Sequence, residues 1–209
     1  MNLILLEGMP GAGKSTVLKA ISRKQTSFTL MHEFQFKREI ITKDYGICQN
    51  GSLIECTNLK LKELEDKLEN FILKSRFQDN SEEFDNIKIE LAKERIKEME
   101  KYNGIVIRES FFGGLIDQCS ENVLKELSKL LTHVNTIFFL ILDANALEER
   151  QRKRLEERDG KFNDKTNKER NKLFLLQFYH VTERRVKTVY LDAEKLSDEI
   201  ADEVIKSLG

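Results

Sequence analysis

The chain has 209 residues, of which 40% are hydrophobic and 34% are charged, a composition typical of one soluble globular domain with its own core. The formal net charge of −1 gives no overall attraction for nucleic acid or for an anionic membrane. No apolar run approaches the roughly 18 residues of a membrane span, and the first residues lack the basic segment of a signal peptide. Three scattered cysteines show no CxxC spacing, so we expect reduced thiols and a cytoplasmic protein.

The first half of the chain predicts two strands and three helices. Apolar runs at 2–7 and 27–31 indicate buried strands. Apolar residues with helical spacing follow at 15–23, 59–77 and 84–102. We therefore expect a strand, a helix and a second strand, followed by two long amphipathic helices.

The second half continues this alternation. It predicts strands at 105–107, 136–142 and 187–191, and helices at 122–131, 147–158, 168–183 and 197–208, with Ser197 as the N-cap of the last helix. Strands that alternate with helices are typical of a parallel sheet covered on both faces. The predicted fold is α/β, with five parallel strands in three layers. Because there is no proline-rich linker and no repeat, we expect a single domain over residues 1–209.

A glycine-rich segment directly after the first strand matches the phosphate-binding pattern GxxxxGK[ST] in full. Its glycines let backbone N–H groups turn toward phosphate oxygens, and the following helix adds the positive end of its dipole. Lys14 is expected to neutralise the β- and γ-phosphates, and the Ser15 hydroxyl to bind Mg²⁺. We therefore predict ATP and Mg²⁺ as cofactors, bound by Gly8, Met9, Pro10, Gly11, Ala12, Gly13, Lys14, Ser15 and Thr16.

Two other classes of P-loop protein fit the sequence poorly. A GTPase would carry an NKxD segment for guanine, which this sequence lacks. A motor ATPase would usually be larger. What remains is a small kinase in which donor and acceptor meet at the carboxyl edge of the sheet.

Several segments together resemble the thymidylate kinase and deoxynucleoside kinase superfamily of P-loop kinases, and the resemblance extends over most of the chain. The first strand and loop read LLEGMPGAGKST, as the superfamily's opening does. The other matching segments are His32-Glu33-Phe34, Phe71 to Arg76, Ile105 to Ser110, Arg154 to Arg158, and Tyr190 to Glu194 with the helix after it. The resemblance implies a three-layer P-loop NTPase fold and an ATP-dependent phosphotransferase.

One segment departs from the superfamily pattern. Members of the superfamily carry an acidic residue followed by an arginine after the third strand, whereas this chain has Arg108-Glu109. A shift of one residue would restore a carboxylate near Mg²⁺. Otherwise the site takes a different acceptor, or none.

The resemblance implies catalytic roles for two glutamates. Glu33 follows the second strand and would be the acceptor-side base or hydrogen-bond acceptor, unless it is a solvated loop residue. Glu109 would hold Mg²⁺ through water or take the acceptor's proton. The alternative for Glu109 is a surface salt bridge with Arg108.

The resemblance also implies cationic and aromatic contacts to the substrates. Arg76 and Arg108 would bind the acceptor, and Phe111 would stack on its base, although an aromatic residue there fits the core equally well. Arg154 and Arg158 share one helical face and would stabilise the transferring phosphoryl group from a lid at about residues 150–167. Together with Lys14, Glu33 and Glu109, they complete the predicted catalytic set.

These residues lead to a principal hypothesis: ATP-dependent phosphoryl transfer to a nucleoside, a nucleotide (thymidylate-like) or a similar small hydroxyl compound. A second hypothesis is an ATP-binding regulatory protein or pseudokinase without turnover. A third is a kinase of an antibiotic or of a nucleic-acid 5′ end, although the near-neutral charge argues against a nucleic-acid partner. A homodimer through the amphipathic stretches at 59–77 and 84–102 stays open, because a monomer's core explains them as well.

Overall fold

The computed structural model describes residues 1–32, 47–54, 56–75, 82–116, 119–156, 164–183 and 185–209. Each predicted helix and strand is present among these residues, with ends displaced by a few residues. In chain order the elements are β1 Asn2–Gly8, α1 Lys14–Lys24, β2 Thr29–Met31, β3 Ile47–Gln49, β4 Ser52–Ile54, α2 Leu59–Ser75, α3 Glu82–Met99, β5 Ile105–Glu109, α4 Glu121–Leu130, the short 3₁₀ helix Leu131–His133, β6 Thr136–Ile141, α5 Ala144–Glu156, α6 Asp164–Thr182, β7 Lys187–Asp192 and α7 Ser197–Leu208.

The strands form one sheet in the order β4-β3-β2-β5-β1-β6-β7. The five strands from β2 to β7 in this order run parallel, which confirms the predicted parallel sheet. The total of five was wrong, because β3 and β4 add an antiparallel hairpin beside β2 and make seven strands. Asn50 and Gly51 form the hairpin's tight turn with φ of 50° and 74°, the backbone that an Asn-Gly pair favours.

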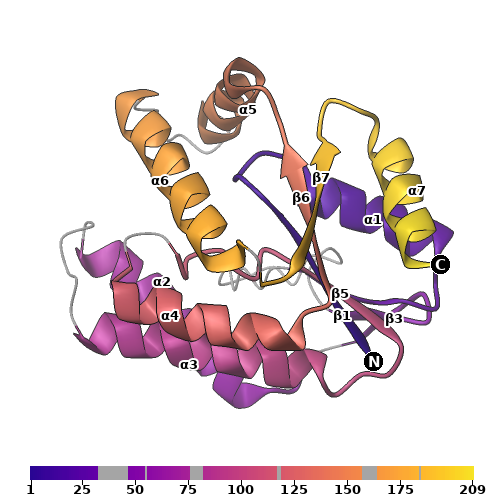
Figure 1. The fold of residues 1–209 in the computed structure, drawn as a ribbon, viewed down its shortest axis with the longest axis horizontal. Coiled ribbons are helices and arrows are strands. Elements are labelled where there is room, and N and C mark those ends of the chain that lie inside the picture. Colours follow the sequence, from indigo (N-terminus) through magenta and orange to yellow (C-terminus); the bar gives the residue numbers. More distant parts are fainter. Residues whose placement is uncertain (33–46, 55, 76–81, 117–118, 157–163, 184) are drawn as a thin grey trace.

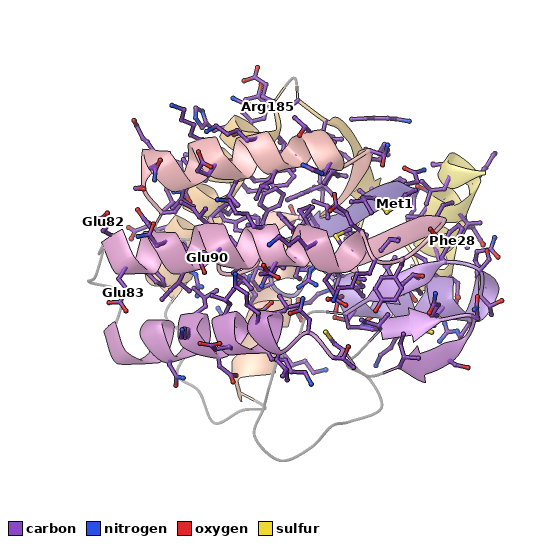
Figure 2. The ribbon with its side chains drawn as sticks, turned by 90° about the horizontal axis from the view of Figure 1, so that it is seen from below. Met1, Phe28, Glu82, Glu83, Glu90 and Arg185 are labelled. Carbon is purple, nitrogen blue, oxygen red and sulfur yellow. The ribbon has the colours of Figure 1, made fainter. Side chains whose placement is uncertain are left out.

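Helices cover both faces of the sheet and give the three predicted layers (Figure 1). On one face α1 packs against α7, and Val17, Ile21, Ile200 and Val204 meet the sheet residues there in one apolar cluster. On the other face lie α2, α3, α4 and α6. In Figure 2, α3 carries Glu82, Glu83 and Glu90 and lies between α2 and α4, with which it packs.

The apolar faces of the two long amphipathic stretches are buried within the chain. Leu61 and Leu64 of α2 and Leu91 and Ile96 of α3 all lie in the larger core cluster. This burial supports the interpretation of these stretches as core, and homodimerisation stays a prediction. None of the described helices is both long and apolar enough to act as a membrane span.

The start of α7 differs from the prediction. Leu196, rather than Ser197, is the N-cap, and its backbone N–H donates to the Glu199 carboxylate at 3.0 Å. A glutamate three residues into a helix satisfies the N-terminal backbone in this way, so the helix begins without a hydroxyl cap.

Candidate nucleotide-binding site

The carboxyl ends of the five parallel strands meet at one edge of the sheet, where α/β folds bind their ligands. These strand ends are Gly8, Met31, Glu109, Ile141 and Asp192. The predicted phosphate-binding loop leaves the central strand β1 at this edge and leads directly into α1. The fold therefore brings the loop next to Glu109.

The glycines of the loop are required by its backbone and by its packing. Gly8 has a φ of 149°, and a side-chain carbon there would lie 2.9 Å from the Leu140 carbonyl oxygen of β6. Gly11 and Gly13 have φ of 95° and 94°, values that residues with side chains rarely adopt. Gly13 is also the N-cap of α1 and brings no side chain to cap it. The first turn of α1 thus has N–H groups suited to a phosphate.

Lys14 and Ser15 open α1 at the mouth of this loop. The Lys14 ammonium donates to the carbonyl oxygens of Gly8 at 2.8 Å and Met9 at 3.2 Å. The exposed Ser15 hydroxyl donates to Oε1 of Glu109 at 3.2 Å. A loop cation, a hydroxyl and a carboxylate therefore lie together at the predicted phosphate-binding loop.

Strand geometry explains how Glu109 reaches the loop although the acidic residue and the arginine are reversed. Side chains of a strand alternate between the two faces of a sheet. Ile107 lies in the core beneath α1, so Glu109 points to that same face, while Arg108 points to the opposite face with Val106. The order of the two residues thus places the carboxylate on the loop side.

His32, directly after β2, also lies beside Glu109. It is buried, and its Nδ1 is 3.4 Å from Glu109 Oε1. No role was predicted for this histidine, because nothing in the sequence indicates that the end of β2 meets the end of β5. The adjacent parallel pairing of these two strands brings them together.

The pair Ser15 and Glu109 fits a magnesium ion. Mg²⁺ prefers hard oxygen ligands and is usually held by one or two protein groups beside substrate phosphates and water. A hydroxyl and a carboxylate that share a hydrogen bond next to a phosphate-binding loop satisfy this requirement. Glu109 is 1% exposed, so few water molecules compete with a cation for its oxygens.

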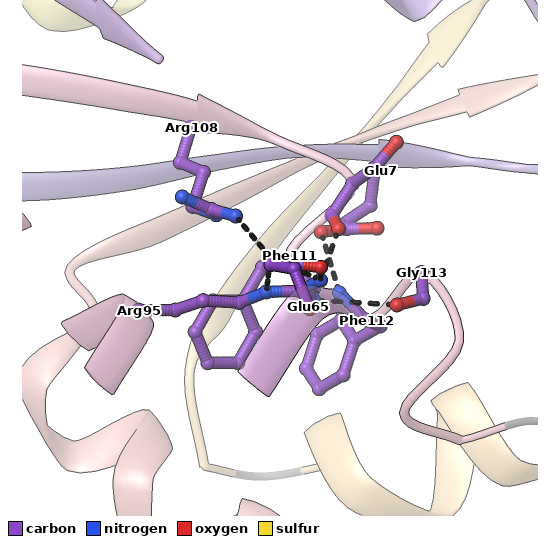
Figure 3. Close-up of polar contacts among 8 residues, drawn as sticks. Glu7, Glu65, Arg95, Arg108, Phe111, Phe112 and Gly113 are labelled. Carbon is purple, nitrogen blue, oxygen red and sulfur yellow. Dashed lines mark hydrogen bonds and ion pairs between the residues drawn. The ribbon is translucent and has the colours of Figure 1, made fainter. Parts of the chain in front are cut away.

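On the opposite face of the sheet Arg108 is fully buried and pairs with Glu65 of α2, with Nη2 3.5 Å from Oε1 (Figure 3). The same carboxylate binds Arg95 of α3. Phe111 is fully buried in the larger core cluster, with its ring edge-on to that of Phe112. This burial supports the core alternative for Phe111 rather than stacking on an acceptor.

Several predicted site residues lie outside the described residues. These are Glu33, Arg76 and Arg158, and the tip of the predicted lid. Arg154 is part of α5, but its side chain is likewise outside the description. Their roles remain predictions.

The helix α5 contributes contacts that the sequence analysis missed. Gln151 is buried, and its Nε2 donates to the Pro10 carbonyl oxygen of the loop at 2.7 Å. Asn171 of α6 donates in turn to Gln151 Oε1 at 3.2 Å. Arg150 also lies beside the loop, since a side-chain carbon at Gly13 would be 4.0 Å from its Nη1. The loop is therefore bordered by the helix that leads to the predicted lid.

Glu7, the last residue before the loop, is another residue that the sequence analysis passed over. Its carboxylate is 1% exposed and accepts a hydrogen bond from the Phe112 N–H at 3.3 Å. Burial raises the pKa of Glu7 from 4.5 to about 7, against the opposing effect of the Lys14 charge. A carboxyl group that titrates near neutral pH thus lies beneath the phosphate-binding loop.

Comparison with known proteins gives a fold and no family. The sequence matches no protein-family model and no curated protein. Among solved structures, deoxyadenosine kinase from M. mycoides is similar over 99% of this chain and 97% of its own, with a TM-score of 0.56 and 15% identity. YorR protein from Bacillus subtilis covers 99% and 95%, with a TM-score of 0.55 and 17% identity. Shikimate kinase from Acinetobacter baumannii covers 99% and 92%, with a TM-score of 0.55 and 14% identity.

These similarities extend over essentially the whole chain, so its fold is that of the P-loop kinases. At such low identity they establish the fold alone. The chemistry has to be argued from the residues at the carboxyl edge of the sheet.

Proposed function

We propose that this protein is a P-loop kinase that transfers the γ-phosphoryl group of ATP, with Mg²⁺, to a nucleoside, a nucleotide or a similar small hydroxyl acceptor. The observation that carries this proposal is the 3.2 Å hydrogen bond from Ser15 to Glu109. It joins the last residue of the GxxxxGKS pattern to a buried carboxylate of the neighbouring strand. A carboxylate there supplies, with the Ser15 hydroxyl, the protein ligands of the Mg²⁺ that phosphoryl transfer from ATP requires.

In this proposal the loop residues bind and orient the donor. Backbone N–H groups of residues 8–16, apart from Pro10, cradle the phosphates, and the Lys14 ammonium exchanges the carbonyls of Gly8 and Met9 for phosphate oxygens. Ser15 and Glu109 would hold Mg²⁺. When bound, the ion neutralises charge on the phosphate oxygens during transfer.

The acceptor would approach from the side of β2 and β5. Glu33 is the proposed base or hydrogen-bond acceptor for the acceptor hydroxyl, and Arg76 the proposed acceptor contact. Arg108, which was predicted as a second contact, is fully buried against Glu65. A role for Arg108 in supporting the floor of the acceptor site fits that burial better than direct binding.

A nucleoside-like acceptor is favoured by the similar structures and by the resemblance in the sequence. Two of the similar structures are deoxyadenosine kinase with dCMP and dCDP bound as products, and YorR in complex with phosphorylated GDP. Shikimate kinase shows that the same fold also carries an acceptor that is no nucleoside. The acceptor panel must therefore be broad.

The proposed lid at about residues 150–167 would close over the donor. Gln151 holds its first part against the loop through the Pro10 carbonyl. Arg154 and Arg158, further along the chain, are the proposed contacts to the transferring phosphoryl group. Such a lid excludes water and so directs transfer to the acceptor.

The proposal is tested by measuring ADP formation from Mg²⁺-ATP with a panel of nucleosides, nucleotides, shikimate and aminoglycosides. We expect acceptor-dependent ADP formation, which Lys14→Ala removes together with ATP binding measured by calorimetry. Retained ATP affinity in Lys14→Ala would contradict the donor site. If the wild type binds ATP but phosphorylates no acceptor of the panel, the proposed kinase activity is contradicted, and an ATP-binding regulatory protein is favoured.

A further inference from the structure

The turn that follows Glu109 wraps around one buried guanidinium. Arg95 of α3 is 1% exposed. Its Nη1 donates to the Phe111 carbonyl oxygen, to that of Gly113 at 3.2 Å and to that of Ser110 at 3.5 Å (Figure 3). Three carbonyls from four consecutive residues thus converge on a single nitrogen.

Glu65 of α2 fixes the orientation of this guanidinium. The Nε of Arg95 donates to one carboxylate oxygen of Glu65 at 3.0 Å, and Nη2 donates to the other at 2.9 Å. This two-pronged arrangement is specific to arginine, because its planar fork matches the carboxylate. It leaves Nη1 directed at the turn.

The turn itself needs such support. Ser110 has a φ of 53°, a left-handed conformation that residues other than glycine rarely adopt. Its N–H donates to the Leu6 carbonyl oxygen of β1 at 3.1 Å, and the Phe112 N–H donates to Glu7 of β1 at 3.3 Å. The strand that leads into the phosphate-binding loop therefore holds the turn from one side, and Arg95 holds it from the other.

We propose that Arg95 is a positioning residue for the magnesium site: held by Glu65, it fixes the turn at residues 110–113 and thereby the Glu109 carboxylate against Ser15. Glu109 is the residue immediately before the left-handed Ser110, so a change in the turn moves its carboxylate relative to β1 and the loop. The inference rests on the proposed function, in which Glu109 holds Mg²⁺. It adds that α2 and α3, distant from the loop in sequence, set the metal affinity.

The test compares nucleotide binding with and without the metal. Affinity for a fluorescent ATP analogue is measured in EDTA and across a Mg²⁺ titration for wild type, Arg95→Lys and Glu109→Gln. Lysine keeps the charge but cannot bind Glu65 with a fork and the turn at once. For Arg95→Lys we expect an unchanged affinity for the nucleotide in EDTA. Its affinity for Mg²⁺ should be lowered about 10-fold, as when groups that orient metal ligands are removed. Arg23→Lys, an exposed change on α1, is the matched control and should equal wild type.

Two further variants separate positioning from a purely structural role. Glu65→Gln keeps the shape and an oxygen that accepts from Arg95, but it removes the charge that orients Arg95 and also pairs with Arg108. It should lower Mg²⁺ affinity in the same way, and it serves if Arg95→Lys does not fold. In the double variant Arg95→Lys with Glu109→Gln, no loss beyond that of Glu109→Gln is expected, because Arg95 acts through Glu109.

Three results would overturn the inference. Full Mg²⁺ affinity in folded Arg95→Lys and Glu65→Gln, beside a loss in Glu109→Gln, would refute positioning while leaving the proposed function intact. Equal losses in EDTA and in Mg²⁺ would show a general structural role only. Undiminished Mg²⁺ affinity in Glu109→Gln would refute both the inference and the proposed metal site.

Discussion

Replacing Glu7 with glutamine is expected to stabilise the fold at neutral and alkaline pH. The carboxyl group is 1% exposed, and burial raises its pKa from 4.5 to about 7. Glutamine keeps the oxygen that accepts the Phe112 N–H and removes the group that must ionise. The expected gain in the free energy of unfolding therefore comes from the ionisation of Glu7 alone.

The sign and size of this gain follow from proton linkage. Because the folded-state pKa is raised, the folded protein binds the proton more tightly than the unfolded chain between pH 4.5 and about 7. Stability of the wild type consequently falls as pH rises through this range and stays lower above it. At about 1.4 kcal/mol per pKa unit, Glu7→Gln should add about 3 kcal/mol at pH 8.5 and less than about 1 kcal/mol at pH 5.

Urea unfolding of wild type and Glu7→Gln at pH 5, 7 and 8.5 measures this difference. The exposed Glu149→Gln on α5 controls for the loss of one negative charge. A gain that does not grow with pH, or a Glu7→Gln protein less stable than wild type at pH 8.5, would refute the reasoning. Either result would mean that Glu7 is held ionised in the folded protein.

Three further predictions concern the loop and its neighbours. Gly8→Ala should lower the free energy of unfolding by about 2 kcal/mol or more, because the new carbon would lie 2.9 Å from the Leu140 carbonyl oxygen at a φ of 149°; wild-type stability in urea would contradict it. Gln151→Leu should cost about 1 kcal/mol in the same assay through its lost bond to Pro10, and no loss would show that the contact is dispensable. Phe111→Ala should cost about 3–5 kcal/mol as a core deletion, whereas a small loss would restore its acceptor role.

The local patterns of the sequence predicted most of the fold. The run from Gly8 to Ser15 predicted the loop, and alternation of strands and helices predicted the parallel sheet and its covered faces. The hairpin of β3 and β4 was missed although Asn50-Gly51 is a strong turn signal. Its strands have three residues each, too few to show a period of two.

The site was predictable where one residue follows a strand end, and not where distant elements meet. Glu109 was identified from its place after the strand predicted at 105–107, and the structure makes it the last residue of β5. The face of the sheet on which Glu109 lies could be assigned only from the alternation of side chains along β5 in the structure. The contacts of Glu7, His32, Arg95 and Gln151 join segments far apart in the chain, and no local pattern marks them. Such pairings depend on which strands and helices are neighbours in the folded protein.

A crystal structure with ADP and Mg²⁺ tests the central claim most directly. We expect the phosphates within the turn of residues 8–16 and Mg²⁺ at about 2.1 Å from the Ser15 hydroxyl oxygen, a typical bond length for this ion. The Glu109 carboxylate should bind the ion directly or through one water molecule. Nucleotide bound elsewhere, or Mg²⁺ held without either Ser15 or Glu109, would contradict the proposed donor site.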